Sequence, residues 1–172
     1  MKIEITANGK TIQTEINEEQ AKILGLTIDK PKTGYERVEK GSTYFFNDGL
    51  SDMNRTKEEK DMEDQDYYNG GNYYNNKTIA KNNARADRLL CCLRQWQALN
   101  DRVINWKNKD ICKYTIRYDY AMNMFNVIPN FCERCLNDVY FTTRETAQRA
   151  INVFKVELEW YFTQYQQRLD EE

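Results

Sequence analysis

Residues 72–80 read Asn-Tyr-Tyr-Asn-Asn-Lys-Thr-Ile-Ala, and residues 139–147 repeat the pattern as Val-Tyr-Phe-Thr-Thr-Arg-Glu-Thr-Ala. In each copy an aromatic pair ends a strand, two small polar residues follow, and a basic residue precedes an alanine by three positions. An alternating aromatic segment lies upstream of each copy. The sequence therefore predicts two strand-to-helix units, at about residues 34–105 and 110–170, within one α+β domain that spans residues 34–172.

A small accessory module is predicted at residues 1–33. Isoleucines alternate with polar residues on both sides of Asn8-Gly9, which is the dipeptide that two-residue hairpin turns favour. Asn17 is placed to cap a short helix after the second strand. The module therefore reads as ββα, and residues 27–34 read as the linker that follows it.

Two long helices are predicted in the main domain. The first spans about residues 77–103, with Asn75 or Asn76 as its cap, and the second spans about residues 143–168, with Thr142 and Glu145 as a capping box. The expected core positions of the two helices are Ile79, Ala86, Leu89, Leu90, Leu93 and Trp96, then Ala147, Ile151, Phe154, Leu158, Tyr161 or Phe162, and Tyr165. Antiparallel strands joined by short turns should pack against them.

Composition sets limits on the function. The chain has 172 residues and no histidine, which excludes histidine-based acid–base catalysis, histidine-activated nucleophiles and histidine metal ligands. The five cysteines are an odd number, as expected for reduced thiols. The sequence begins without an apolar leader, and no apolar run approaches the roughly 18 residues that cross a bilayer. We therefore expect a cytoplasmic protein without a membrane-spanning segment.

The net charge of −2 conceals two blocks of opposite sign. Residues 48–66 hold eight acids and three bases, a net of −5, whereas residues 77–117 hold ten bases and three acids, a net of +7. Adjacent blocks of opposite sign suit a partner of mixed charge.

The acidic block is the first candidate partner-binding surface. Its residues are Glu58, Glu59, Asp61, Glu63, Asp64, Asp66, Tyr67 and Tyr68. Carboxylates beside aromatic rings can imitate the phosphates and the stacked bases of a nucleic acid. The alternative interpretation is a mobile, solvated loop.

The basic block supplies a second candidate surface, on one face of the first long helix. Its residues are Lys77, Lys81, Arg85 and Arg88. They could contact the phosphates of DNA or of an RNA. The alternative interpretation is an ordinary solvated helix face.

Neither catalysis nor a metal or other cofactor is expected. Cys132 and Cys135 form one Cys-x-x-Cys pair, but a second such pair is missing, so a zinc site completed by Cys112 and Cys91 or Cys92 is disfavoured. A metal-dependent nuclease would need converging carboxylates. The available set is Asp119, Glu133 and Asp138, with Lys113 nearby in sequence, and its spacing matches no nuclease signature.

The aromatic strand, the Asp/Asn-rich loop, the Gly71-Asn72-Tyr73-Tyr74 turn and the lysine at the helix start resemble a recurrent small accessory protein of Firmicutes phages and prophages. Residues 114–118 and 139–150 resemble the C-terminal unit of the same group, so the resemblance covers about residues 34–165. It implies an accessory phage protein, and some proteins of this type are anti-CRISPR inhibitors of type II CRISPR nucleases. No functional residue carries over.

Charge and resemblance together lead to one functional hypothesis and two alternatives. We expect a non-enzymatic phage-encoded protein that binds a bacterial CRISPR effector nuclease or its ribonucleoprotein. The first alternative is a small DNA- or RNA-binding regulator that uses the basic helix. The second alternative is a metal-dependent nuclease.

Overall fold

The structure is a computed structural model that describes residues 2–7, 10–25, 32–49 and 53–171. The chain divides into two compact units, Met1–Lys32 and Thr33–Glu172. Helices combine with antiparallel sheets, which confirms the predicted α+β class. Within the described residues, no helix has both the length and the apolar composition that crossing a bilayer requires.

The first unit is a hairpin followed by a short helix. Strands β1 (Lys2–Ala7) and β2 (Lys10–Glu15) pair antiparallel, and helix α1 spans Glu18–Ile23. The Asn17 side chain accepts a hydrogen bond from the Gln20 amide at 2.8 Å, and the Gln20 side chain accepts one from the Asn17 amide at 2.9 Å. This reciprocal pair is a capping box, as the cap at Asn17 suggested. The Asn8-Gly9 turn lies outside the described residues.

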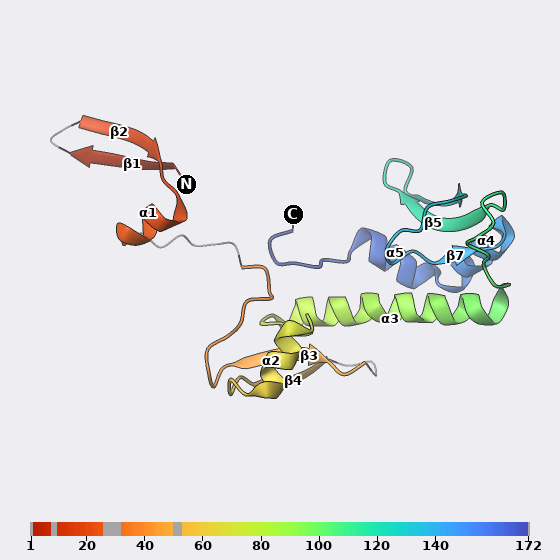
Figure 1. The fold of residues 1–172 in the computed structure, drawn as a ribbon, viewed down its shortest axis with the longest axis horizontal. Helices are drawn as coiled ribbons and strands as arrows, with labels where there is room; N and C mark the ends of the chain where they lie inside the picture. The colour runs from red at the N-terminus through yellow and green to blue at the C-terminus, as the bar shows by residue number, and fades with distance from the viewer. Residues whose placement is uncertain (1, 8–9, 26–31, 50–52, 172) are drawn as a thin grey trace. The chain divides into compact units, whose positions relative to one another are not determined.

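The second unit contains the following elements in chain order: β3 (Thr43–Asn47), β4 (Met53–Lys57), α2 (Met62–Asn69), α3 (Lys77–Asn100), β5 (Lys113–Asp119), β6 (Met124–Asn130), β7 (Tyr140–Phe141), α4 (Arg144–Val153) and α5 (Lys155–Thr163). Strands β3 and β4 form one antiparallel hairpin, and a three-stranded antiparallel sheet has the order β6-β5-β7. Helix α3 contacts the β3–β4 hairpin on one side and α4 and α5 on the other (Figure 1). It is the element that both sheets share.

The repeated sequence pattern has the same structure in both copies. Tyr74 pairs antiparallel with Phe45, and Tyr140 and Phe141 pair antiparallel with β5. Two residues after each aromatic pair comes the helix cap. Asn76 accepts from the amides of the first turn of α3, and Thr143 accepts from an amide of the first turn of α4. In both helices the alanine of the pattern, Ala80 or Ala147, is buried.

The main core lies between α3, α4, α5 and the three-stranded sheet. Its buried residues are Leu89, Leu93, Val127, Phe141, Ala147, Ala150, Ile151 and Leu158. A smaller cluster of Tyr74, Ile79 and Ala80 lies between the start of α3 and the β3–β4 hairpin. The predicted faces are therefore largely correct, although Leu90, Trp96 and Phe154 are only half-buried and Tyr161 is exposed.

Gly34, predicted to lie in a linker, is buried instead. It has a φ of +99°, and a Cβ atom at this position would lie 3.1 Å from the Ile79 side chain. Nearby, Leu169 donates its amide to the Thr33 carbonyl at 2.9 Å, and Tyr35 donates its hydroxyl to the Gln167 carbonyl at 3.3 Å. The C-terminal segment is thus fixed to the start of the second unit.

The second long helix, predicted at about residues 143–168, is divided into α4 and α5 and ends at Thr163. Phe154 leaves the helical conformation, with φ −104° and ψ 19°, and separates α4 from α5. Neither glycine nor proline is present there, so packing is the cause we infer: the Phe154 ring meets the Trp96 ring edge-on, with centroids 6.5 Å apart. The cap is also displaced by one residue, because the Thr142 hydroxyl donates to the Asp101 carboxylate and Thr143 becomes the cap.

We expect Phe141→Ala to lower the free energy of unfolding by roughly 3–5 kcal/mol, because it empties a fully buried aromatic site. Val153→Ala is the matched control on the exposed side of α4, and it should change stability by at most about 0.5 kcal/mol. Urea titration of both variants measures the difference. Equal losses would contradict the core described above.

Candidate binding surfaces

From Met53 onward, the acidic segment is folded and is not a mobile loop. Strand β4 occupies Met53–Lys57 and helix α2 occupies Met62–Asn69. Asp61 caps α2: its carboxylate accepts from the Asp64 amide at 3.0 Å, and the Asp64 carboxylate accepts from the Asp61 amide at 3.3 Å. The spacing Asp-x-x-Asp was the sequence signal that could have predicted this helix.

Glu58 was predicted to lie on the acidic surface, and it is instead completely buried. Its carboxylate accepts from Nε and Nη2 of Arg37, at 3.2 and 2.8 Å, and from the Tyr73 hydroxyl at 2.8 Å. The Arg37 hydrogen bond lowers the pKa of Glu58 below its ordinary value, against the opposing effect of burial. The residue stabilises the fold and is not available to a partner.

Asp64 is the second correction, since it is also buried. Its carboxylate accepts from the Tyr44 hydroxyl at 2.7 Å and from the Glu59 amide at 2.7 Å. Burial acts to raise the pKa of Asp64, but the hydrogen bonds from Tyr44 and the backbone amides together lower it. Sequence reasoning also missed Arg37 and Tyr44, whose partners lie about twenty residues away in sequence.

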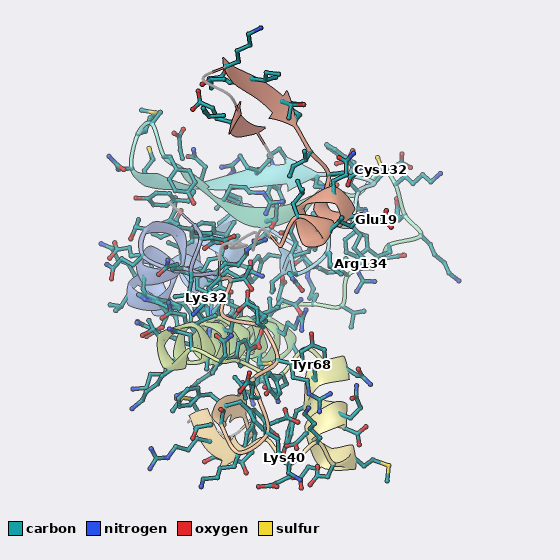
Figure 2. All side chains as sticks on the ribbon, turned by 90° about the vertical axis from the view of Figure 1, so that its left-hand side faces the viewer. Glu19, Lys32, Lys40, Tyr68, Cys132 and Arg134 are labelled. Carbon is teal, nitrogen blue, oxygen red and sulfur yellow. The ribbon has the colours of Figure 1, made fainter. Side chains whose placement is uncertain are left out.

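The remaining acidic candidates are exposed: Glu59, Asp61, Glu63 and Asp66. Glu59 lies 3.6 Å from the Lys40 ammonium group, which offsets part of its charge. Tyr67 stacks on Phe46 with ring centroids 4.4 Å apart and is half-buried. Tyr68, which Figure 2 labels, is 41 % exposed. The acidic surface is therefore smaller and less negative than the sequence suggested.

The buried carboxylates predict how stability depends on pH. Both pKa values are lowered in the folded state, so the unfolded chain binds more protons as pH falls through the ordinary values of 4.5 and 3.8. The contribution of the two carboxylates to the free energy of unfolding should be fully present above about pH 5.5 and should fall progressively below about pH 5. Urea unfolding between pH 3 and 7 measures this dependence.

Glu58→Gln, which leaves the Arg37 charge without its partner, should cost roughly 2–4 kcal/mol at pH 7. It should also flatten the acid dependence. Glu63→Gln, an exposed carboxylate on α2, is the control and should change neither quantity appreciably.

A groove beside α3 brings three of the four basic candidates together. Lys81, Arg85 and Arg88 line a cavity of about 440 Å³, together with Glu157 of α5. Its other lining residues are Met53, Ala84, Leu89, Cys92 and Phe154. Lys77 does not line it and lies one helical turn earlier. We call this cavity the α3 groove.

Arg85 is held in place within the α3 groove. Its guanidinium donates two hydrogen bonds to Glu157, at 2.8 and 3.2 Å, and lies 4.0 Å from the centre of the Trp160 ring. By contrast, Lys81 and Arg88 are exposed and form no ion pair with any residue that the structure describes. These two cations are therefore available to an anionic ligand.

The alternative metal and nuclease sites are not assembled. Across the described ranges, no three His, Cys, Asp or Glu side chains are grouped to hold a metal ion. Cys91, Cys132 and Cys135 are exposed and unpaired. Asp119 accepts from the amides of its own turn, and Asp138 forms a bidentate pair with Arg117.

Comparison with protein-family models, with curated proteins and with solved structures found no match.

Proposed function

We propose that this chain acts by binding, without catalysis, and that the α3 groove binds the phosphate backbone of a nucleic acid. The observation that supports this most is the pair of exposed, unpaired cations, Lys81 and Arg88, beside the oriented guanidinium of Arg85. Phosphate contacts of this kind supply most of the sequence-independent affinity for nucleic acids.

The placement of Lys77 is consistent with this proposal. It lies in the first turn of α3, where the helix dipole is positive and a carboxylate would be the stabilising residue. No acid occupies that turn. A cation in this position is unfavourable for the helix itself and extends the positive face toward the α3 groove.

The biological use that we propose is inhibition of an RNA-guided bacterial nuclease of type II, as the resemblance to phage accessory proteins implies. The ligand of the α3 groove would then be a phosphate segment of the guide RNA or of the target DNA in the ribonucleoprotein. On this proposal the protein works in the cytoplasm of the bacterial host. The alternative use is regulation of phage or host genes by direct binding of DNA or RNA.

The Lys81→Gln/Arg88→Gln variant tests the α3 groove directly. Wild-type protein should bind a fluorescent duplex with an association constant that falls as the salt concentration rises. In the variant, the plot of log association constant against log salt concentration should be less steep by about 1.8, which is roughly 0.9 for each lost phosphate contact. Anisotropy titrations at several salt concentrations measure both quantities.

Lys57→Gln/Lys60→Gln is the matched control, because it removes the same charge at exposed positions that lie outside the α3 groove and form no ion pair with any described residue. It should leave the slope within about 0.3 of wild type. Identical slopes for the groove variant and the wild type would refute the proposal. Arg85 is retained in both variants, since its loss would leave Glu157 unpaired.

A second candidate surface is the exposed part of α2, where Glu63 and Asp66 share a short helix with the exposed ring of Tyr68. As a phosphate mimic, this surface would compete for a cationic channel of the nuclease and would steer the encounter by charge.

Cleavage assays with a panel of type II nucleases compare the two surfaces. If α2 is the inhibitory surface, Glu63→Lys/Asp66→Lys should slow association at least tenfold at low salt, while Lys81→Gln/Arg88→Gln inhibits normally. If the α3 groove is the inhibitory surface, Lys81→Gln/Arg88→Gln should slow association at least tenfold at low salt, and Glu63→Lys/Asp66→Lys should inhibit normally. Glu58, Asp61 and Asp64 are left intact because they maintain the fold.

A further inference from the structure

A second cationic cavity lies at the other end of α3, outside both surfaces described above. It has a volume of about 430 Å³ and is lined by Arg94, Arg102 and Arg134, with Trp106 and Tyr140 in its wall. A volume of this size is within the range of small-molecule sites. We call it the arginine cavity.

The three arginines of the arginine cavity are free to bind an anion. All three are exposed, and none forms an ion pair with another part of the chain that the structure describes. Two carboxylates also line the cavity, but Asp138 is paired with Arg117 on the neighbouring strand. Asp101 is occupied by hydrogen bonds from Thr142 and from the Arg102 amide.

Lys113 adds a further positive charge behind the Trp106 ring. Its ammonium group is buried and donates to the carbonyls of Asn108 and Phe131, at 2.6 and 3.0 Å, and it lies 5.8 Å from the ring centre. The carboxyl end of α3 contributes only about half a negative charge. Asp101 contributes one full negative charge, so the three arginines and Lys113 keep an excess of about 2.5 positive charges.

The arginine cavity is also largely preformed. The Trp106 ring meets Tyr140 edge-on, with centroids 4.9 Å apart, and the Arg134 guanidinium lies 5.2 Å from its centre. Asn105 fixes the turn that carries Trp106 by accepting from the amides of Lys107 and Asn108. An arginine oriented by a ring loses less freedom on binding.

We propose that the arginine cavity binds a phosphate monoester attached to an apolar or aromatic body, that is, a nucleotide, either free or at the 5′ end of a strand. A phosphate monoester carries about −1.5 to −2 charges and three acceptor oxygens, which suits several guanidinium groups better than a carboxylate does. Val103, which is 95 % exposed at the rim, and Ile104 provide apolar surface for the attached body. This inference does not depend on the proposed function of the α3 groove.

Titration with 5′-AMP tests the proposal, with Trp106 fluorescence as the signal. The background variant is Lys81→Gln/Arg88→Gln, so that the α3 groove contributes no binding. We expect 5′-AMP to change the fluorescence and adenosine to have no effect. Trp106→Phe should abolish the signal while calorimetry still detects binding.

Arg94→Gln/Arg134→Gln in the same background should weaken 5′-AMP binding at least tenfold, whereas Arg55→Gln, an exposed arginine on β4, should not. Thermal melts of each variant establish that it is folded. No binding of 5′-AMP or of a 5′-phosphorylated trinucleotide at millimolar concentration would overturn the proposal, as would binding that both arginine substitutions leave unchanged.

The two sources of the ligand are separated by comparing 5′-AMP with 5′-phosphorylated and 5′-hydroxyl trinucleotides. A phosphorylated trinucleotide that binds at least tenfold tighter than 5′-AMP identifies a strand end. Equal affinities identify a free nucleotide. A hydroxyl trinucleotide that binds as tightly as its phosphorylated counterpart contradicts the role of the phosphate.

Discussion

The burial of one face of α3 is the interaction on which the rest of the second unit depends. An isolated helix of 24 residues with this polar composition is marginal in water, so packing must hold it. Ile79 and Ala80 pack toward the β3–β4 hairpin, and Leu89 and Leu93 pack toward the three-stranded sheet. Because the two sheets use neighbouring parts of the same helix, its rotation is fixed along its length. The solvent face that carries Lys81 and Arg88 follows from that rotation.

The charged residues of the chain have two different roles that composition alone does not separate. Glu58 and Asp64 belong to the acidic block in sequence, yet in the fold each is a buried acceptor for tyrosine and for arginine or backbone donors. A buried carboxylate is stable only when its hydrogen bonds are made. The donors Arg37 and Tyr44 come from a preceding segment, so the charge count of residues 48–66 overestimates the negative surface.

Sequence periodicity predicted those parts of the fold that local interactions determine. The repeated aromatic pair, the cap at Asn76 and helix α3 all depend on near neighbours, and each lies close to its predicted position. In β5 the alternation is less simple, because Lys113 and Thr115 are buried whereas Tyr114 and Ile116 are half-buried. Helix α2 was missed because its capping aspartates were interpreted as solvated charge. The break at Phe154 and the shift of the cap to Thr143 could not be predicted, because they depend on Trp96 and Asp101, which are distant in sequence. The same holds for the site: the cations of α3 were evident from the sequence. Glu157 and Trp160 come from α5, and Arg102, Trp106 and Arg134 of the arginine cavity lie outside α3.

The two cationic sites on α3 face different directions, which constrains any ligand. Arg94 lies six positions after Arg88 in the sequence. At 3.6 residues per turn they are rotated by about 120° and displaced by about 9 Å along the axis. A straight phosphate backbone lying in the α3 groove would therefore not reach Arg94 without bending around the helix. The helix thus presents two separate cationic sites, one lined by Lys81, Arg85 and Arg88 and the other lined by Arg94, Arg102 and Arg134. On the two proposals made above, a ligand of one site need not compete with a ligand of the other.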